Sequence, residues 1–403
     1  MNFKELSKSV TFWIFVALFA GITVGIAAPD VAKEMDIFSK IFLKLIKTIV
    51  APLLFATLII GIAGHADMKQ VGRMGWKSFV YFEIVTTIAL AFGLIAANTI
   101  RPGDGVDLSS VDKSTAINVA KQDWKDIILH IFPENVAKSI AEGQVLQIVV
   151  FSIIFAIGLS MVTNQKHKAT MLEWTESLAE VMFKFTKIVM YFAPFGVFGA
   201  MAFAVGKMGP GVLFSLAKLL GTVYASLFAF LLLVLLPIAL LFKVNIVKFL
   251  KAVAEPVTIA FGTASSEAAL APAMQRLEEY GVPRKFVSFV LPTGLSFNLD
   301  GSTLYLAAAS IFVAQAQHIE LSIGQQLTMM LTLMLTSKGV AGVARASLVI
   351  LMGTVSTFGL SDTPIYIILA VDVLMDMART SVNMLGNCLA AVVVAKWEGE
   401  FED

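Results

Sequence analysis

The sequence of 403 residues is poor in charge, since Asp, Glu, Lys and Arg together make up only 15% of it. Soluble domains contain roughly 25% charged residues. The formal net charge is +1, so the chain lacks the basic excess with which proteins attract nucleic acid. This composition predicts no nucleic-acid partner and an environment other than water.

Residues for metal and disulfide chemistry are also scarce. The single cysteine, Cys388, lies in an apolar stretch, which excludes an intrachain disulfide and a cysteine-based metal site. The four histidines occur at segment ends or in loops without ligand spacing: His65, His130, His167 and His318. We therefore expect no resident metal and no cofactor.

Apolar residues are abundant. They make up 58% of the chain, and the mean hydropathy is +0.83. Runs near the ~20 residues that a membrane helix needs occur at 10–28, 41–63, 79–100, 145–162, 183–206 and 219–242. The strand-and-turn pattern of a barrel is absent. We predict an all-α polytopic protein embedded in a lipid bilayer, with the first run retained as a membrane helix.

Basic residues gather in some of the connecting loops. Segments 64–78, 163–182 and 243–251 are rich in Lys, Arg or His, whereas the longest polar connection, 101–142, is richer in Asp. By the positive-inside rule, the basic loops and both termini are cytoplasmic. The short loops suit a bacterial cell inner membrane.

The regular spans stop after residue 242. Two apolar segments, 244–281 and 327–356, are interrupted by small polar residues at 262–267 and 336–342. A third segment, 286–314, is interrupted at 296–302. Broken helices of this kind mark the binding site of many transporters, because their open backbone needs cover from protein or from a water-filled cavity.

The last apolar segment, 362–397, carries a stripe of polar side chains. Steps of three and four residues place them on one helical face. Each charge at membrane depth costs at least ~2.5–3.5 kcal/mol on insertion scales, so such groups usually serve a function. The stripe contains Asp372, Asp376, Arg379, Thr380, Asn383 and Asn387.

The residue types in this stripe predict a substrate. Arg379 offers a planar fork that matches a carboxylate, and Asp376, one turn away, could accept an ammonium group. Ser266 and the amides of the first interruption could hold a second carboxylate. Together these groups describe an acidic amino acid. Alternatively, Asp376 and Arg379 neutralise each other. For Asp372 we expect a separate role as an internal hydrogen-bond partner that supports the others.

Two other classes of protein fit less well. A channel would need a ring of carbonyls or charges. Here one chain alone supplies both positive and negative side chains, a mixture that suits a small zwitterion better than a bare ion. An enzyme would need a nucleophile with a base. Ser265, Ser266 and Glu267 form the only candidate, and no histidine accompanies them on an apolar segment. We therefore expect a transporter and not an enzyme.

Four motifs occur in the last part of the chain: FGTASSEAAL, LPTGLSFNLDGSTLY, TSKGVAGV and MDMARTSVNMLGN. In this order they resemble the dicarboxylate/amino acid:cation symporter family, whose best-known members are the glutamate transporters. The chain looks closest to the bacterial proton/glutamate–aspartate symporters, and the resemblance covers essentially all of it.

The resemblance implies a homotrimer whose protomers each have eight transmembrane helices and two re-entrant helical hairpins. Residues 1–73 and 101–206 would form a scaffold of helices one, two, four and five. Residues 74–100 and 207–403 would form a transport domain with helices three, six, seven and eight and both hairpins. This domain would move across the membrane like an elevator.

The resemblance also implies roles for individual residues. Arg379 would bind the side-chain carboxylate of the substrate and Asp376 its amino group, while the first hairpin tip would contact the main-chain carboxylate. The implied substrate-binding set is Ser265, Ser266, Ser302, Gly342, Asp376, Arg379, Thr380 and Asn383.

Departures from the family pattern bear on the coupling ion. Sodium-coupled members carry an aspartate where this chain has Asn387, and Lys338 lies in the second hairpin tip near another sodium site. Acids that could carry protons are Glu83, Glu267 and Asp300. We expect proton-coupled uptake of L-glutamate or L-aspartate. The alternatives are sodium coupling through Asn298, Asp300 and Asn383, or a C4-dicarboxylate symporter of the same fold, whose members generally lack an acid at the position of Asp376.

Overall fold

The computed structural model describes residues 10–63, 68–106, 132–337 and 346–401, and every regular element in these ranges is a helix. The helices long and apolar enough to cross a membrane are Val10–Ala27, Pro29–Ile60, Arg73–Ile100, Val212–Leu241 and Arg284–Ala316. A bent pair, Gln165–Met190 with Ala193–Met208, brings the number to six if it counts as one span. The predicted helical, multi-pass architecture is therefore confirmed for the described part of the chain.

One group of helices packs around α10, which crosses α2 and α4 and touches α3. The other face of α4 packs against α8 and α9. The contact between α2 and α10 is close, because a Cβ at Gly25 would lie 2.8 Å from Cγ1 of Val205. This group consists of α2 (Val10–Ala27), α3 (Pro29–Lys33), α4 (Asp36–Ala63), α7 (Val136–Glu142), α8 (Val145–Ser160), α9 (Gln165–Met190) and α10 (Ala193–Met208).

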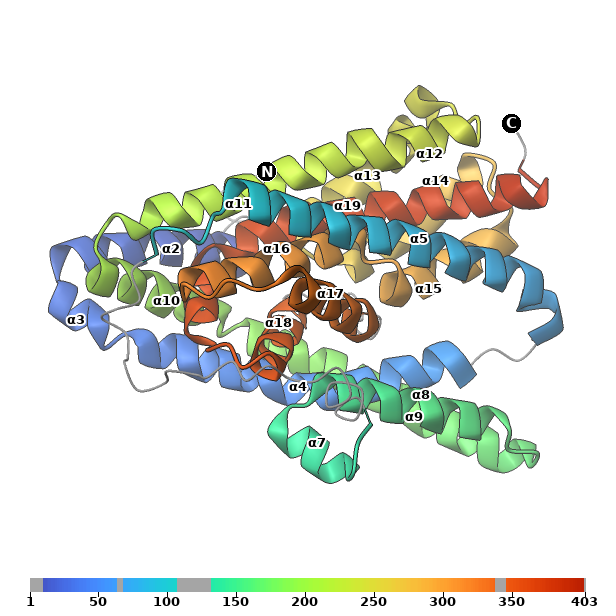
Figure 1. The fold of residues 1–403 in the computed structure, drawn as a ribbon. Helices are drawn as coiled ribbons and strands as arrows, with labels where there is room; N and C mark the ends of the chain where they lie inside the picture. The colour runs from blue at the N-terminus through green and yellow to red at the C-terminus, as the bar shows by residue number, and fades with distance from the viewer. Residues whose placement is uncertain (1–9, 64–67, 107–131, 338–345, 402–403) are drawn as a thin grey trace.

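A second group packs around α16, of which every residue is buried. Its main neighbours are α5 and α19, which run along the long axis of the molecule in Figure 1. The group consists of α5 (Met68–Ile100), α11 (Val212–Phe230), the π-helical turn η1 (Leu231–Leu235), α12 (Leu236–Leu241), α13 (Ile246–Thr263), α14 (Ser266–Glu279), α15 (Arg284–Phe297), α16 (Asp300–Ala316), α17 (Ile323–Ser337), α18 (Ala346–Thr357) and α19 (Thr363–Glu398).

Two of the three interruptions lie where the small polar residues predicted them. The break between α13 and α14 is at Ala264, whose φ is +49°, and the Ser265 side chain caps α14 by accepting from the Ala268 N–H. The break between α15 and α16 spans Asn298 and Leu299. In the third interruption α17 ends at Ser337, and residues 338–345 lie outside the described ranges.

Two expected spans differ from the observed helices. The run 183–206 is not one straight helix, because α9 ends at Met190 and α10 begins at Ala193 with a bend of 48°. Pro194, in the first turn of α10, lacks the N–H that would continue the preceding helix. The run 145–162 forms α8 of only 16 residues. The final segment, by contrast, is the unbroken 36-residue helix α19.

The close approach of α5 to α16 can be tested at Gly93. A Cβ there would lie 3.0 Å from the carbonyl carbon of Leu304 and 3.1 Å from the Cβ of Ala307. Gly93→Ala should therefore destabilise the protein by roughly 1–3 kcal/mol, as overpacking does, and lower its unfolding temperature in detergent. The control is Gly221→Ala on α11, where no heavy atom lies within 4 Å and alanine should stabilise the helix by roughly 0.5–1 kcal/mol. Equal unfolding temperatures for the two variants would contradict this packing.

Candidate functional site

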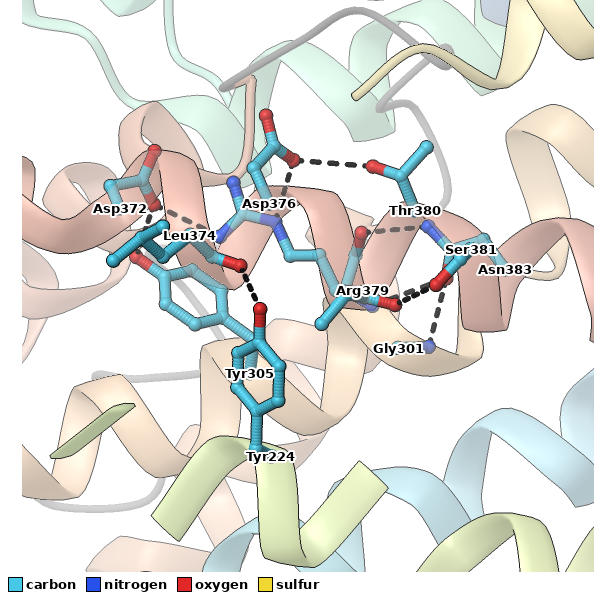
Figure 2. A network of polar contacts seen from close by, with 12 residues as sticks. Tyr224, Gly301, Tyr305, Asp372, Leu374, Asp376, Arg379, Thr380, Ser381 and Asn383 are labelled. Carbon is cyan, nitrogen blue, oxygen red and sulfur yellow. Dashed lines mark hydrogen bonds and ion pairs between the residues drawn. The ribbon is translucent and has the colours of Figure 1, made fainter. Parts of the chain in front are cut away.

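The centre of the site is Arg379, in the middle of α19 and fully buried. Its Nε donates to Oδ1 of Asp376 at 2.9 Å, and its Nη1 donates to Oδ1 of Asp372 at 3.0 Å. Figure 2 shows both carboxylates on the same side of the helix as the guanidinium. Within the described ranges the third nitrogen, Nη2, has no hydrogen-bond partner. A buried guanidinium with one open N–H corner can bind a further carboxylate.

Tyr305 on α16 completes the support of the arginine. The guanidinium carbon of Arg379 lies 4.1 Å from the centre of the tyrosine ring, a cation–π distance. The Tyr305 hydroxyl donates to Oδ1 of Asp372 at 3.1 Å. Asp372 is therefore the internal hydrogen-bond partner that the sequence predicts, and it fixes both the arginine and the tyrosine.

The beginning of α16 is attached to α19 by Asn383. The backbone N–H groups of Gly301 and Ser302 donate to Oδ1 of Asn383 at 2.8 and 3.2 Å, and Nδ2 of Asn383 donates to Oγ of Ser302 at 3.0 Å. A Cβ at Gly301 would lie 2.8 Å from the Cα of Arg379, so only glycine permits this approach. The amide of Asn383 thus satisfies helix-terminal N–H groups that have no partner within α16.

Thr380 supports the carboxylate of Asp376 within α19, since its hydroxyl donates to Oδ1 of Asp376 at 3.3 Å. A contact to another helix comes from α11, where the hydroxyl of Tyr224 donates to the backbone carbonyl of Leu374 at 2.7 Å (Figure 2). Side chains of α11 and α16 thus hold α19 in place.

A second buried polar cluster lies two turns further along α19. Nδ2 of Asn298 donates to Oδ2 of Asp300 at 3.2 Å and to Oδ1 of Asn387 at 3.0 Å. All three residues are fully buried. Oδ1 of Asn298 and Nδ2 of Asn387 have no hydrogen-bond partner in the part of the chain that the structure describes. A carboxylate with amide oxygens is a set of hard ligands that suits a small cation or a proton.

A cavity of about 360 Å³ reaches the site from the side. One wall contains Ser265 and Glu267 from the tip between α13 and α14, and Asp376 from α19. The cavity is also lined by the first turns of α2 and the last turns of α9. Asp376 is therefore the point at which the buried Arg379 network meets open space.

The predicted site residues are brought together only in part. Asp376, Arg379 and Thr380 form one hydrogen-bonded network. Ser302 and Asn383 form a second one, and Ser265 lines the cavity. Ser266 is buried at the beginning of α14 and is not part of the cavity wall.

The predicted proton carriers have different surroundings. Glu267 lines the cavity, and its side chain is exposed there. Glu83 is half-buried on α5 and does not line the cavity, and Asp300 is fully buried. Lys338 and Gly342 lie outside the described residues. Within the described ranges no group of three His, Cys, Asp or Glu side chains could hold a metal ion.

Tyr305 is the residue that the sequence reasoning missed. It follows Ser302 by three residues, so both lie on one face of α16. That spacing was the only signal available, because a tyrosine in an apolar helix is more often a packing residue.

Comparison with known proteins gives three kinds of relative. Residues 10–397 match the family described as the sodium:dicarboxylate symporter family. A proton/sodium-glutamate symport protein of Geobacillus stearothermophilus is 41% identical over 97% of this chain and 94% of its own length. In Bacillus subtilis (strain 168), a proton/glutamate-aspartate symporter is 40% identical over 98% of this chain and 96% of its own length. A C4-dicarboxylate transport protein of the same organism is 38% identical over 99% of this chain and 96% of its own length.

The role of Asp372 can be tested by its isosteric amide. Asp372→Asn leaves Arg379 paired with Asp376 but replaces a charge-assisted hydrogen bond by a weaker neutral one, at a cost of roughly 1–2 kcal/mol, so the unfolding temperature in detergent should fall. Asp104→Asn is the matched control, because Asp104 forms an exposed pair with Arg101 and such pairs contribute ~0–1 kcal/mol. If both variants unfold like the unmodified protein, Asp372 does not support Arg379.

Proposed function

Because the chain belongs to the sodium:dicarboxylate symporter family, we propose that it is a secondary active symporter that imports L-glutamate or L-aspartate together with protons. The observation that carries the proposal is the buried pair of Arg379 and Asp376 at the wall of the cavity. One group suits a carboxylate and the other an ammonium, and an acidic amino acid has both.

Binding would proceed by exchange of partners. The side-chain carboxylate of the substrate binds the open Nη2 corner of Arg379. The substrate ammonium takes over Asp376, while Asp372 and Tyr305 continue to hold the guanidinium. Ser265 lines the cavity where the main-chain carboxylate would lie. Ser266, Ser302, Thr380, Asn383 and Gly342 complete the proposed pocket.

The same geometry bears on the choice between amino acids and C4-dicarboxylates. Relatives named for either substrate are about equally similar to this chain, at 40% and 38% identity. A C4-dicarboxylate has no ammonium, and a second carboxylate would be repelled by Asp376. Asp376 therefore favours the amino acid, and the C4-dicarboxylate symporter is the alternative.

Protons are the proposed coupling ion. The cluster of Asn298, Asp300 and Asn387 contains one carboxylate, and the amide of Asn387 adds no negative charge for a sodium ion. The sodium alternative also needs Asn383, whose carbonyl oxygen already accepts two backbone N–H groups. Glu83 and Glu267 are further candidate proton carriers.

The two groups of helices suggest how the substrate moves. In the proposed elevator, the group around α10 is the trimeric scaffold, and the group around α16 is the transport domain with the site at its centre. The described helices would belong to eight transmembrane helices and two re-entrant hairpins. With both termini cytoplasmic, the cavity beside the first turn of α2 faces the cytoplasm, in what we propose to be a bacterial cell inner membrane.

The Asp376 assignment predicts a change in substrate preference. Asp376→Ser should reduce glutamate or aspartate uptake into proteoliposomes by at least tenfold, because the ammonium loses its only charged partner. Uptake of succinate, which has no ammonium, should fall far less or rise. Equal losses for both kinds of substrate would favour a structural ion pair with Arg379 over direct contact with the substrate.

The coupling ion can be tested in proteoliposomes with an imposed gradient. Uptake of radiolabelled glutamate should proceed under an inwardly directed pH gradient with potassium as the only metal cation. Collapsing that gradient with a protonophore should abolish accumulation. Accumulation that requires sodium and is unaffected by the pH gradient would refute proton coupling while leaving the substrate assignment intact.

A further inference from the structure

The cavity beside the site has a wall that the proposed pocket does not use. It contains two lysines of α9, Lys184 and Lys187, which face the cavity whose other wall contains Asp376 and Glu267. Both lysines are exposed, and neither forms an ion pair or a hydrogen bond within the described ranges. They belong to the bent pair of α9 and α10, which is apolar enough to cross the membrane.

Charged side chains within a membrane span are costly unless they face a water-filled cavity or an opposite charge. The exposed side chains of α9 include the apolar Val181 and Ile188, and also the acid Glu180 one turn before Lys184. Both lysines line the cavity together with Thr186 and Met190. A cavity that holds water would let both ammonium groups stay hydrated within a membrane span.

The opposite wall is unfavourable for an anion. Arg379 carries one positive charge but has both Asp372 and Asp376 as partners, so this group of three has a formal charge of −1. Glu267 lies beside it on the same wall. A dicarboxylate that crosses the cavity would meet net negative charge if the lysines were absent.

We propose that Lys184 and Lys187 form a second contact site for the dicarboxylate substrate, on the helix group that stays fixed. This inference rests on the proposed function, since it takes the occupant to be the transported acidic amino acid. The two ammonium groups attract the free carboxylate of the substrate as it leaves or enters the pocket, and they raise its local concentration on this side only. Clefts that focus charge raise association rates by ~10–10³-fold, and the effect weakens at high salt.

The test uses the double variant Lys184→Gln/Lys187→Gln in proteoliposomes of known orientation, with KM for glutamate measured separately from each side. We expect KM on the cavity side to rise at least threefold, KM on the opposite side to stay unchanged, and the salt dependence of the cavity-side KM to disappear. Lys184→Arg/Lys187→Arg should restore the unmodified values. Lys166→Gln, at the exposed beginning of α9 and outside the cavity wall, is the control and should change neither KM.

Three results would overturn the inference. An unchanged cavity-side KM would show that the lysines do not contact the substrate. A similar change on both sides, or a failure of the arginine variant to restore KM, would indicate a structural role. If the unmodified protein transports succinate and not glutamate, the same measurements are made with succinate. That result counts against the amino-acid assignment alone. If the protein transports neither substrate, both the proposed function and the lysine contact site are contradicted.

Discussion

The burial of one guanidinium at membrane depth is the constraint on which the rest of the site depends. Arg379 is completely shielded, and a charge in that position is tolerated only with close opposite charges and hydrogen bonds. Asp372, Asp376 and Tyr305 supply them. The remaining N–H corner has no hydrogen-bond partner within the described ranges. A buried guanidinium in this situation suits a carboxylate as its further partner.

The broken helix pair α15 and α16 follows from the same constraint. In a continuous helix the backbone N–H groups would donate to carbonyls of the preceding turn. The break instead leaves the N–H groups of Gly301 and Ser302 without a helical partner, and Oδ1 of Asn383 accepts from both. The break also allows the backbone of Gly301 to approach Arg379. The irregular backbone at membrane depth is covered by α19, which is the condition under which such backbone persists.

The two polar clusters share one short segment of chain. Residues 298–302 contain Asn298 and Asp300 of the deeper cluster and the N–H groups that bind Asn383. On α19, Asn383 and Asn387 are one turn apart and contact the two ends of this segment. These contacts join the two polar clusters through one segment of backbone.

The sequence by itself determined the features that depend on local periodicity. Apolar runs predicted the helical membrane architecture, small polar residues predicted the breaks near 264 and 298, and a 3.6-residue period placed Asp372, Asp376 and Arg379 on one face. The bend between α9 and α10 was missed although it has a local signal, because Pro194 lacks the N–H that would continue the helix. Tertiary structure alone brought Tyr305 under Arg379 and joined Asn298 to Asn387 across 89 residues. It also placed Lys184 and Lys187 opposite Asp376. No periodicity encodes such pairs, since contact between separate helices is set by the packing of the whole chain.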